Sequence, residues 1–340
     1  MSFHVDASAP VRELPGEAVP YYLADGDGRA HLLLGQVGRA LAGTEETAGA
    51  MSVMTALGPA GGPIPMHRHE AEHDWFLCVR GAIQVWADGA SRVLYPGDVA
   101  SVPPGVLHAY QFHGHYSQFM GPIAPAGWDR FFDLTGMPYT GPAYPQVDNS
   151  PPPFAKFGAA EAKFAMKYFP EEPYAEAGTG ADDALPGAQE PYFLRAGEGP
   201  RHLLFGQVAY QLMTGAESGG RLGMTVTEGP KCPPIPTHVH QGTYEGIYCL
   251  DGRLRVTIEG VDNLLTRGDF VSIPAGCEHA YALESHLTRF ATMYGPSGLE
   301  RFHEVAGEIA EQRIFPEDSP AVDPDRLAAA GAELDIAFAG

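Results

Sequence analysis

Histidines and carboxylates that could bind a metal gather in two short stretches of the chain. In PMHRHEAEHDWFLCVRG, residues 65–81, His67 and His69 stand two positions apart, and Glu72, His73 and Asp74 follow. Residues two apart on a strand face the same side, so the first two imidazoles can bind one ion. Only one of the three residues that follow would be needed as a further donor.

The second stretch, THVHQGTYEGIYCLDG at 237–252, holds a simpler version of this pattern. His238 and His240 are two apart, Glu245 follows on what we expect to be the next strand, and His279 closes the later turn IPAGCEH. Three imidazoles and one carboxylate leave two positions of an octahedron open for substrate, water or O₂. Open positions are typical of catalytic rather than structural metal sites.

These stretches belong to an internal duplication. PYYLADGDGRAHLLLGQV begins at Pro20 and PYFLRAGEGPRHLLFGQV begins at Pro191, an offset of 171 residues. The same offset pairs the potential donors of the two halves: His67, His69, Asp74 and His108 match His238, His240, Glu245 and His279. Matches at one offset over about 90 residues indicate a module copied within the chain.

Each module is predicted to be all-β. Segments such as FLCVRGAIQVWADG and IYCLDGRLRVTIEG are short alternating runs broken by Gly or Asp-Gly, as in strands joined by tight turns. We divide the chain into an N-terminal domain at 1–145, a linker at 146–190, a C-terminal domain at 191–305 and a helical tail at 306–340. Helices are expected within FGAAEAKFAMKYF, LERFHEVAGEIAEQ and DPDRLAAAGAELDI, the last capped by Asp323.

The motifs resemble those of the cupin superfamily. Its first motif, G-x5-H-x-H-x(3,4)-E-x6-G, is matched from His238 to Gly252, with Cys232 at the position of the leading Gly. Its second motif, G-x5-P-x-G-x2-H, is matched in both modules and ends at His108 and His279. The resemblance implies a bicupin, with two tandem jelly-roll β-barrels and a few peripheral helices.

Among two-cupin proteins, the chain is most similar to the quercetin 2,3-dioxygenases, through HVHQGTYEGIYCLDG, GDFVSIPAGCEHAY and SHLTRF. Those enzymes are metal-dependent and open a flavonol ring with O₂, releasing carbon monoxide. The resemblance implies one or two divalent transition metal ions, with Glu245 as a metal ligand and catalytic base. The implied ligands are His238, His240, Glu245 and His279, and their counterparts His67, His69, Asp74 and His108. Mn, Fe, Co, Ni and Cu all accept such donors, so the metal is left open.

Asp74 departs from the glutamate of the family motif. Its side chain is one methylene shorter, about 1.5 Å, whereas metal–ligand distances are about 2.0–2.2 Å. Asp74 therefore draws its strand inward, reaches the ion through water, or leaves a three-histidine site. Glu72 or His73 could take its place if the turn is displaced. We expect instead that both lie on a solvated turn, because charged turn residues are usually solvated.

Strand parity predicts the surroundings of the ion. The positions expected to face inward beside the donors are Ile247, Tyr281, Phe76, Tyr110 and Phe112. They would form an apolar, partly aromatic pocket suited to a flat organic substrate. Cys78 and Cys249 share this parity and are expected to fill the core rather than bind metal.

The charge balance argues against some partners. The chain of 340 residues has 21 Lys and Arg against 42 Asp and Glu, a net charge of −21, whereas nucleic acids and anionic membranes attract basic surfaces. We find no signal-peptide pattern and no apolar run near the ~18 residues of a membrane span, and four cysteines are too sparse for a disulfide framework. We expect a cytoplasmic protein, monomer or homodimer, whose partners are a small aromatic substrate and O₂.

Other functions are compatible with the same metal donors. A decarboxylase of the oxalate decarboxylase type would use them too, but it needs a cationic group to hold a small acid, and the expected inward positions supply none. A three-histidine N-terminal site would also suit gentisate-type ring cleavage. A non-catalytic bicupin would bind a metal or a small molecule without consuming O₂.

Elemental analysis tests the metal prediction. We expect about one or two equivalents of a divalent transition metal per chain, and a lower content in His240→Ala, which lacks one imidazole donor. A folded, metal-supplemented preparation without metal would contradict the prediction.

Overall fold

The structure is a computed structural model that describes residues 13–141, 143–145, 148, 153–179, 183–316 and 322–339. Two compact units make up the chain. The N-terminal unit runs from Gly28 to Ala196, and the C-terminal unit combines Gly197–Gly340 with the segment that precedes Gly28. Each unit is described by itself.

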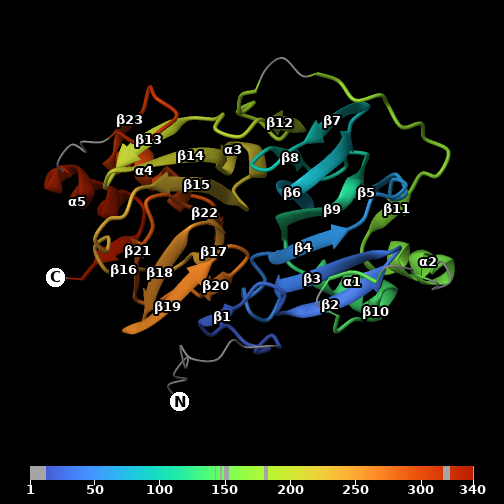
Figure 1. Cartoon of the computed structure of the whole chain (residues 1–340), viewed down its shortest axis with the longest axis horizontal. Coiled ribbons are helices and arrows are strands. Elements are labelled where there is room, and N and C mark those ends of the chain that lie inside the picture. The colour runs from blue at the N-terminus through green and yellow to red at the C-terminus, as the bar shows by residue number, and fades with distance from the viewer. Residues whose placement is uncertain are drawn as a thin grey trace. The chain divides into compact units, whose positions relative to one another are not determined.

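The N-terminal unit is built on one extended sheet of 11 strands (Figure 1). Its main path is β10-β2-β3-β4-β9-β6-β8-β12, with β5, β7 and β11 paired to its side. The strands are β2 (Arg29–Leu33), β3 (Gln36–Ala42), β4 (Ser52–Gly58), β5 (His67–His69), β6 (His73–Ala87), β7 (Ala90–Leu94), β8 (Val99–Val102), β9 (His108–Ala124), β10 (Met137–Pro138), β11 (Met166–Tyr168) and β12 (Tyr192–Leu194). The long strands β6 and β9 pair along most of their length and so connect both faces of a jelly roll.

The C-terminal unit repeats this plan with two sheets, of 8 and 5 strands. The larger follows the order β1-β20-β17-β22-β15-β14-β13-β23, and the smaller the order β19-β18-β21-β16-β24. The strands are β1 (Tyr21–Leu23), β13 (Arg201–Leu204), β14 (Gln207–Met213), β15 (Gly223–Gly229), β16 (His238–His240), β17 (Tyr244–Asp251), β18 (Arg253–Ile258), β19 (Val261–Thr266), β20 (Phe270–Ile273), β21 (His279–Leu283), β22 (Thr288–Gly295), β23 (Glu308–Ile309) and β24 (Ile336–Phe338). The predicted architecture of two tandem, mainly β modules with a few peripheral helices is confirmed.

The closing glycine of the first motif shapes the strand that carries the carboxylate. Gly81 and Gly252 have φ values of 72° and 77°, which L-residues with a side chain rarely adopt. A Cβ at Gly81 would also collide with Ser117, and one at Gly252 with the backbone of Leu287. Only glycine fits at these two equivalent bends.

The first strand of each sequence repeat is incorporated into the unit formed mainly by the other repeat. β1 pairs antiparallel with β20 in the C-terminal unit, with Leu23 opposite Phe270. β12 pairs antiparallel with β8 in the N-terminal unit, with Leu194 opposite Val99. Leu23 and Leu194 are both fully buried, so each exchanged strand contributes to a core as well as to a ladder.

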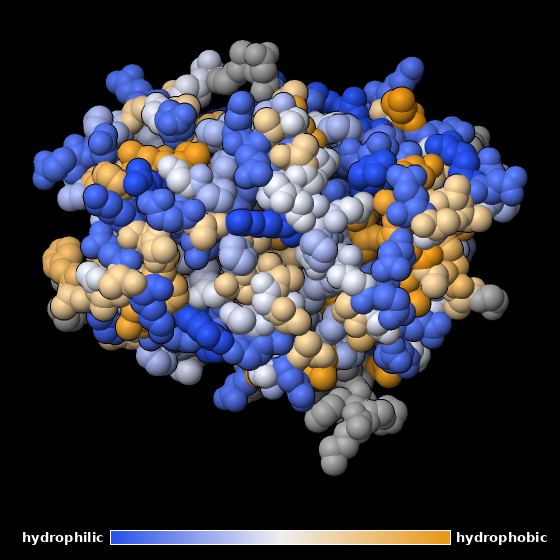
Figure 2. All heavy atoms as spheres, turned by 180° about the vertical axis from the view of Figure 1, so that it is seen from behind, coloured by the Kyte–Doolittle hydropathy of each residue, from blue (hydrophilic) through white to orange (hydrophobic). Residues whose placement is uncertain are grey.

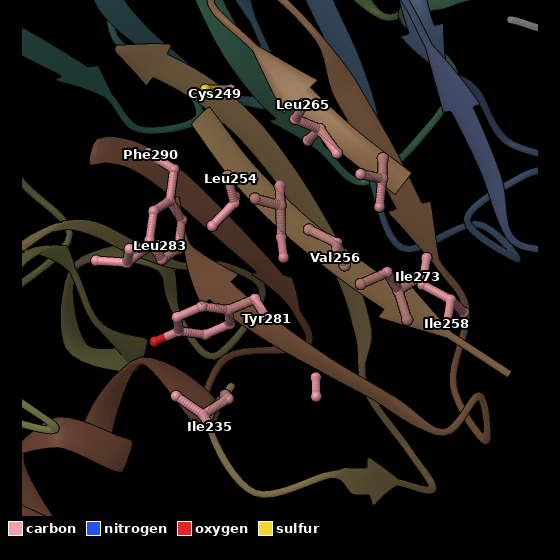
Figure 3. Close-up of a cluster of buried hydrophobic side chains, with 13 residues drawn as sticks. Ile235, Cys249, Leu254, Val256, Ile258, Leu265, Ile273, Tyr281, Leu283 and Phe290 are labelled. Atoms are coloured by element: carbon pink, nitrogen blue, oxygen red, sulfur yellow. The ribbon is translucent and has the colours of Figure 1, made fainter. Parts of the chain in front are cut away.

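Each barrel encloses an apolar core. In the C-terminal unit, Leu254, Val256 and Phe290 pack in a cluster that also contains Cys249, and Tyr281 lies at its end with its hydroxyl directed away from the aliphatic side chains (Figure 3). Cys78 occupies the matching core of the N-terminal unit. All four cysteines are free thiols, and the expectation that Cys78 and Cys249 fill the core is confirmed.

The helices are short and peripheral. They are α1 (Asp129–Thr135), α2 (Phe154–Lys163), α3 (Gly215–Ser218), the 3₁₀ helix η1 (Leu299–Arg301), α4 (Phe302–Ala306) and α5 (Pro324–Glu333). Asp323 caps α5 as predicted, accepting hydrogen bonds from the backbone of Asp325 and Arg326. The helices expected at 157–169 and 299–312 are only partly helical, because β11 and β23 occupy their second halves.

Residues that the composition places in the linker and the tail complete the barrels. β11 pairs with the histidine strand β5, and β24 pairs with the histidine strand β16. Each follows a helix, α2 or α5, that ends two or three residues before it. The repeat therefore extends to a helix and a strand that close each donor strand on its open side.

Hydrophilic and apolar residues are interspersed on the face shown in Figure 2, where the most strongly apolar residues form small separate patches. Within the described residues, no helix combines the length and the apolar character needed to cross a membrane.

The exchanged strand β1 offers a test of the fold. Replacing the fully buried Leu23 by alanine leaves a cavity in the C-terminal unit, so Leu23→Ala is expected to lower the free energy of unfolding by about 2–5 kcal/mol. Leu264→Ala is the control, because Leu264 is 44% exposed and its loss is expected to cost less than about 1 kcal/mol. Urea denaturation followed by fluorescence measures both, and equal losses would contradict the contribution of β1 to this core.

Candidate metal centres

Three strands bring the N-terminal donors together. β5 carries His67 and His69, the start of β6 carries Asp74, and β9 begins with His108 directly opposite His67. One donor atom from each of the four side chains lies within 4.8 Å of the others, and all four residues are buried. Donors that are distant in the sequence therefore meet because β5 and β6 both adjoin β9.

The C-terminal donors meet in the same way. His238 on β16 lies opposite His279 on β21, and His240 and Glu245 follow on β16 and β17. These four side chains also offer donor atoms within 4.8 Å of one another. Both clusters have the composition of a transition-metal site.

Backbone carbonyl groups orient most of the imidazoles. The Nδ1 atom of His67 lies 2.9 Å from the carbonyl oxygen of Pro65, and that of His108 lies 2.9 Å from Val106. In the C-terminal cluster, the matching Nδ1 distances are 3.0 Å from His238 to Pro236 and 2.9 Å from His279 to Cys277. An Nδ1–H that donates to a carbonyl leaves Nε2 unprotonated and directed at a metal, which is how metal-binding histidines are usually held.

His69 is the exception. Its counterpart His240 has Nδ1 2.7 Å from the carbonyl oxygen of Thr243, whereas both ring nitrogens of His69 are buried without a hydrogen-bond partner among the described residues. The nearest carboxylate to its Nδ1 is that of Glu72, at 3.9 Å. Buried nitrogens without partners are costly, and a metal ion at Nε2 would satisfy one of them.

Asp74 reaches its cluster despite the shorter side chain. Its Oδ2 lies 3.2 Å from Nε2 of His108 and 3.7 Å from Nε2 of His69. Glu245 is more centred, with Oε2 at 3.0 Å from His240 and 3.1 Å from His279. Oδ1 of Asp74 is buried with no hydrogen-bond partner among the described residues, so it is free to accept one. Both donor sets therefore fit a divalent transition metal ion.

The two residues beside Asp74 do not join the donors. His73 is fully buried, and its Nε2 lies 2.7 Å from Oγ of Ser101. Glu72 is half-buried and lies beyond His69 rather than among the Nε2 atoms. The expectation that both lie on a solvated turn is wrong for His73, because β6 begins at this residue and turns its side chain into the barrel wall.

The electrostatics of the N-terminal cluster suit a cation. Burial lowers the pKa of His69 to about 4 and that of His67 well below its usual value, so both rings are neutral at pH 7. Burial alone would raise the pKa of Asp74, but attraction to His69 and the hydrogen bond to His108 outweigh it and hold the pKa below its ordinary range. Neutral imidazoles around a carboxylate anion are the protonation states that a metal requires.

The C-terminal cluster differs at one ring. Burial lowers the pKa of His238 to about 4. Burial alone would raise the pKa of Glu245, but the close Nε2 atoms of His240 and His279, which attract the carboxylate when these rings are protonated, outweigh it and hold the pKa below its ordinary range. Burial alone would lower the pKa of His279, but the hydrogen bond to Glu245 and the attraction of its charge together raise it. Glu245 lies close to both rings, at 3.0 Å from His240 and 3.1 Å from His279.

An apolar cavity opens beside the N-terminal donors. Its volume is about 90 Å³, and His67 and Asp74 lie in its wall. Aromatic rings form much of the rest, including Phe76, Tyr110, Trp128, Phe131, Phe157 and Tyr168. Trp128 packs against His69 with 4.0 Å between ring centroids and stacks on Phe131 at 4.4 Å. The lining of the cavity is therefore apolar and rich in aromatic rings, as in many sites for aromatic molecules.

The cavity beside the C-terminal donors is about half as large. Its volume is about 40 Å³, and it is lined by His238, His240 and Glu245 together with Tyr281. Of the predicted pocket residues, Phe76, Tyr110 and Tyr281 line the cavities, whereas Phe112 and Ile247 pack within the hydrophobic cores. Both tyrosines are held by a glutamine: Tyr110 donates to Gln36 at 2.7 Å and Tyr281 donates to Gln207 at 2.9 Å.

The cavities also contain residues that strand parity does not reveal. Trp128 and Phe131 come from the first turn of α1 and the residue before it, Tyr168 from β11, and His303 from α4. These elements lie outside the metal-binding motifs, but most of them recur at the same 171-residue offset. Extending the repeat comparison past the second motif would have pointed to them.

Comparison with known families agrees with this geometry. The family described as Cupin domain matches the chain twice, at residues 53–116 and 224–289. The chain therefore carries two copies of a segment similar to the cupin domain. The two matched segments include all eight proposed metal donors, and in each unit they cover the strands from the one that precedes the histidine motif to the one that follows the second motif.

Two relatives extend the comparison over most of the chain. It is 29% identical over 315 residues to quercetin 2,3-dioxygenase of Bacillus subtilis (strain 168), covering 92% of this chain and 94% of the relative. It is 27% identical over 286 residues to quercetin 2,3-dioxygenase of Aspergillus japonicus, covering 74% and 81%. Among solved structures, oxalate decarboxylase from Bacillus subtilis superposes with a TM-score of 0.51 at 16% identity, covering 81% of this chain and 76% of the other, which shows a shared fold.

Asp74→Asn tests whether this side chain is the acidic donor of the N-terminal cluster. The neutral amide removes the only anion among these donors, so metal affinity there is expected to fall at least about tenfold, while the C-terminal cluster keeps its own. Glu72→Gln is the matched control and is expected to leave both affinities nearly unchanged. Stepwise cobalt titration of metal-free protein, followed by absorption, resolves the two sites. A larger effect of Glu72→Gln than of Asp74→Asn would contradict the assignment.

Proposed function

We propose that the protein is a metal-dependent dioxygenase that opens the ring of a flavonol such as quercetin or of a similarly enolisable aromatic compound. The observation that carries this proposal is the position of a three-histidine, one-carboxylate cluster in the wall of an apolar, aromatic-lined cavity. The names of the two curated relatives support it.

The ligand set follows from the clusters. His67, His69, Asp74 and His108 would hold one ion, and His238, His240, Glu245 and His279 another. A bound transition metal would act as a Lewis acid toward a substrate hydroxyl and assist reaction with O₂. The carbonyl contacts at Nδ1 hold most of the imidazole rings in one orientation. These side chains therefore lose little conformational entropy when substrate binds.

The carboxylates are the candidate bases. In each unit the carboxylate is buried, ionised and within hydrogen-bond reach of one or two imidazoles. Glu245 would accept the proton of a substrate hydroxyl in the C-terminal site, and Asp74 would do so through its unpartnered Oδ1 in the N-terminal site. A base next to an acidified hydroxyl is well placed for this transfer.

The cavity walls would position the substrate and exclude water. The stacked rings of Trp128 and Phe131 provide a flat apolar surface close to His69. Overall, a flavonol and O₂ would give a ring-opened ester and carbon monoxide, with one molecule of gas released for each O₂ consumed.

The cavities count against a small dianionic substrate. Among the described residues that line either metal-site cavity, none is Arg or Lys. A small dicarboxylate would therefore lack the cationic partner that a buried charge needs besides the metal. This composition disfavours the alternative of the oxalate decarboxylase type.

Oxygen uptake tests the proposal. Metal-loaded protein with quercetin is expected to consume O₂ and release an equal amount of carbon monoxide, and luteolin, which lacks the 3-hydroxyl that would be deprotonated, is expected to give no uptake. The double variants His67→Ala/His69→Ala and His238→Ala/His240→Ala each remove one cluster, so at least one should lose uptake. Metal-replete protein that is inactive with quercetin, or equal uptake with luteolin, would contradict the proposal.

A further inference from the structure

The two cavities share their metal donors but not their walls. The 171-residue offset and the strand registers pair the lining positions one by one; for example, Ala56 lies opposite Phe119 on β4 and β9, and Thr227 lies opposite Phe290 on β15 and β22. At four paired positions the apolar or small residue of the N-terminal cavity is replaced by a polar one: Ala56 by Thr227, Gly121 by Thr292, Ile123 by Tyr294 and Phe132 by His303.

These replacements change both size and polarity. Three of the four C-terminal residues are larger than their counterparts, and the C-terminal cavity is correspondingly smaller, at about 40 Å³ against about 90 Å³. Hydroxyl groups and an imidazole stand where the N-terminal cavity has methyl groups, hydrogen and a phenyl ring. A flavonol carries two ring systems, so the smaller cavity suits about half of such a molecule.

His303 is the most informative of these residues. It lies on α4, lines the C-terminal cavity and is 6% exposed. Its Nε2 is buried without a hydrogen-bond partner among the described residues. Burial, and then the neighbouring His202, lower its pKa to about 4, so the ring is neutral at pH 7. A buried neutral imidazole with an unsatisfied nitrogen is unfavourable in the free protein and available to a ligand.

We infer that the C-terminal cavity binds a single-ring phenol with adjacent oxygen substituents, of the catechol type, and that His303 hydrogen-bonds one of these oxygens. The flavonol-sized substrate then belongs to the N-terminal cavity. This division of ligands rests on the proposed function for its N-terminal half, whereas the binding of a phenol by the C-terminal cavity stands apart from it.

The lining supports a phenol over other small molecules. Phe290, Leu299 and Phe302 give the C-terminal cavity apolar walls for one ring, while the donor cluster and His303 offer partners for oxygen. A small aliphatic dianion lacks a cation there, and a purely apolar ligand would leave the His303 nitrogen unpaired. A ring with neighbouring hydroxyl groups satisfies both kinds of surface.

Calorimetry under nitrogen tests the inference without turnover. Catechol is expected to bind metal-loaded protein with one site per chain, and to bind the His67→Ala/His69→Ala variant equally well, because that variant keeps the C-terminal cluster. The probe 3-hydroxyflavone, a flavonol without a catechol group, is expected to bind the wild type but not this variant.

Exchange of the paired residues identifies the role of His303. His303→Phe, which installs the N-terminal residue, is expected to weaken catechol binding about tenfold, the loss of one buried hydrogen bond. His303→Asn keeps a hydrogen-bonding group and is expected to retain most of the affinity. Metal content and the thermal transition of both variants show that the site is intact. A general cavity defect would instead weaken binding in both variants alike, which would contradict a hydrogen bond from His303.

The outcomes separate the two proposals. Equal binding of 3-hydroxyflavone by wild type and by the His67→Ala/His69→Ala variant would overturn the division of ligands, even if quercetin is oxidised. Absence of a catechol site in the wild type would overturn the C-terminal assignment. Lack of quercetin-dependent O₂ uptake would refute the proposed function, and catechol binding that depends on His303 would still stand.

Discussion

Each site depends on the fixed orientation of a few imidazole rings. A histidine can offer either nitrogen to a metal, and in water the ring turns freely. Here the Nδ1 atoms of five of the six clustered histidines lie within hydrogen-bond distance of a carbonyl oxygen of their own strand or turn, so Nε2 is directed inward before any ion arrives. The pairing of β5 with β9 and of β16 with β21 brings these oriented rings together, because it places His67 opposite His108 and His238 opposite His279.

The duplication keeps this arrangement and varies what surrounds it. Metal donors are constrained to within a few tenths of an ångström, whereas a cavity wall tolerates many side chains of compatible volume. The carboxylate donors differ only slightly between the two clusters. Asp74 and Glu245 both reach their clusters, although the shorter Asp74 lies 3.7 Å from His69 whereas Glu245 lies 3.0 Å from His240. The residues that line the cavities differ much more between the two units. For example, Phe132 and His303 occupy equivalent positions of the repeat.

Much of this could be predicted from the sequence, because the donors lie on strands where a spacing of two residues fixes the side that a residue faces. The spacing indicated the paired histidines, the constant offset of 171 residues revealed the repeat, and the resemblance to the cupin motifs completed both donor sets. Strand parity predicts which side of a strand a residue faces, but not whether it reaches the cavity. Phe112 and Ile247 face inward as predicted, yet they pack within the hydrophobic cores. The prediction for His73 was wrong, because local polarity indicated solvent exposure but the start of a strand buries the ring. The strand β11 was hidden in a polar segment, because three residues paired to β5 are too few to show periodicity.

The exchange of β1 and β12 has a consequence for how such a chain can be divided or permuted. The N-terminal unit is one continuous segment, Gly28–Ala196, that carries its own borrowed strand at its end. The C-terminal unit is discontinuous, and it receives β1 from the other end of the gene product. In terms of connectivity, the N-terminal unit is inserted between β1 and the rest of the C-terminal unit, so the boundaries of the folding units are shifted from those of the sequence repeats. A cut at the start of the second repeat, before Pro191, would therefore remove β12 from the N-terminal unit and β1 from the C-terminal unit.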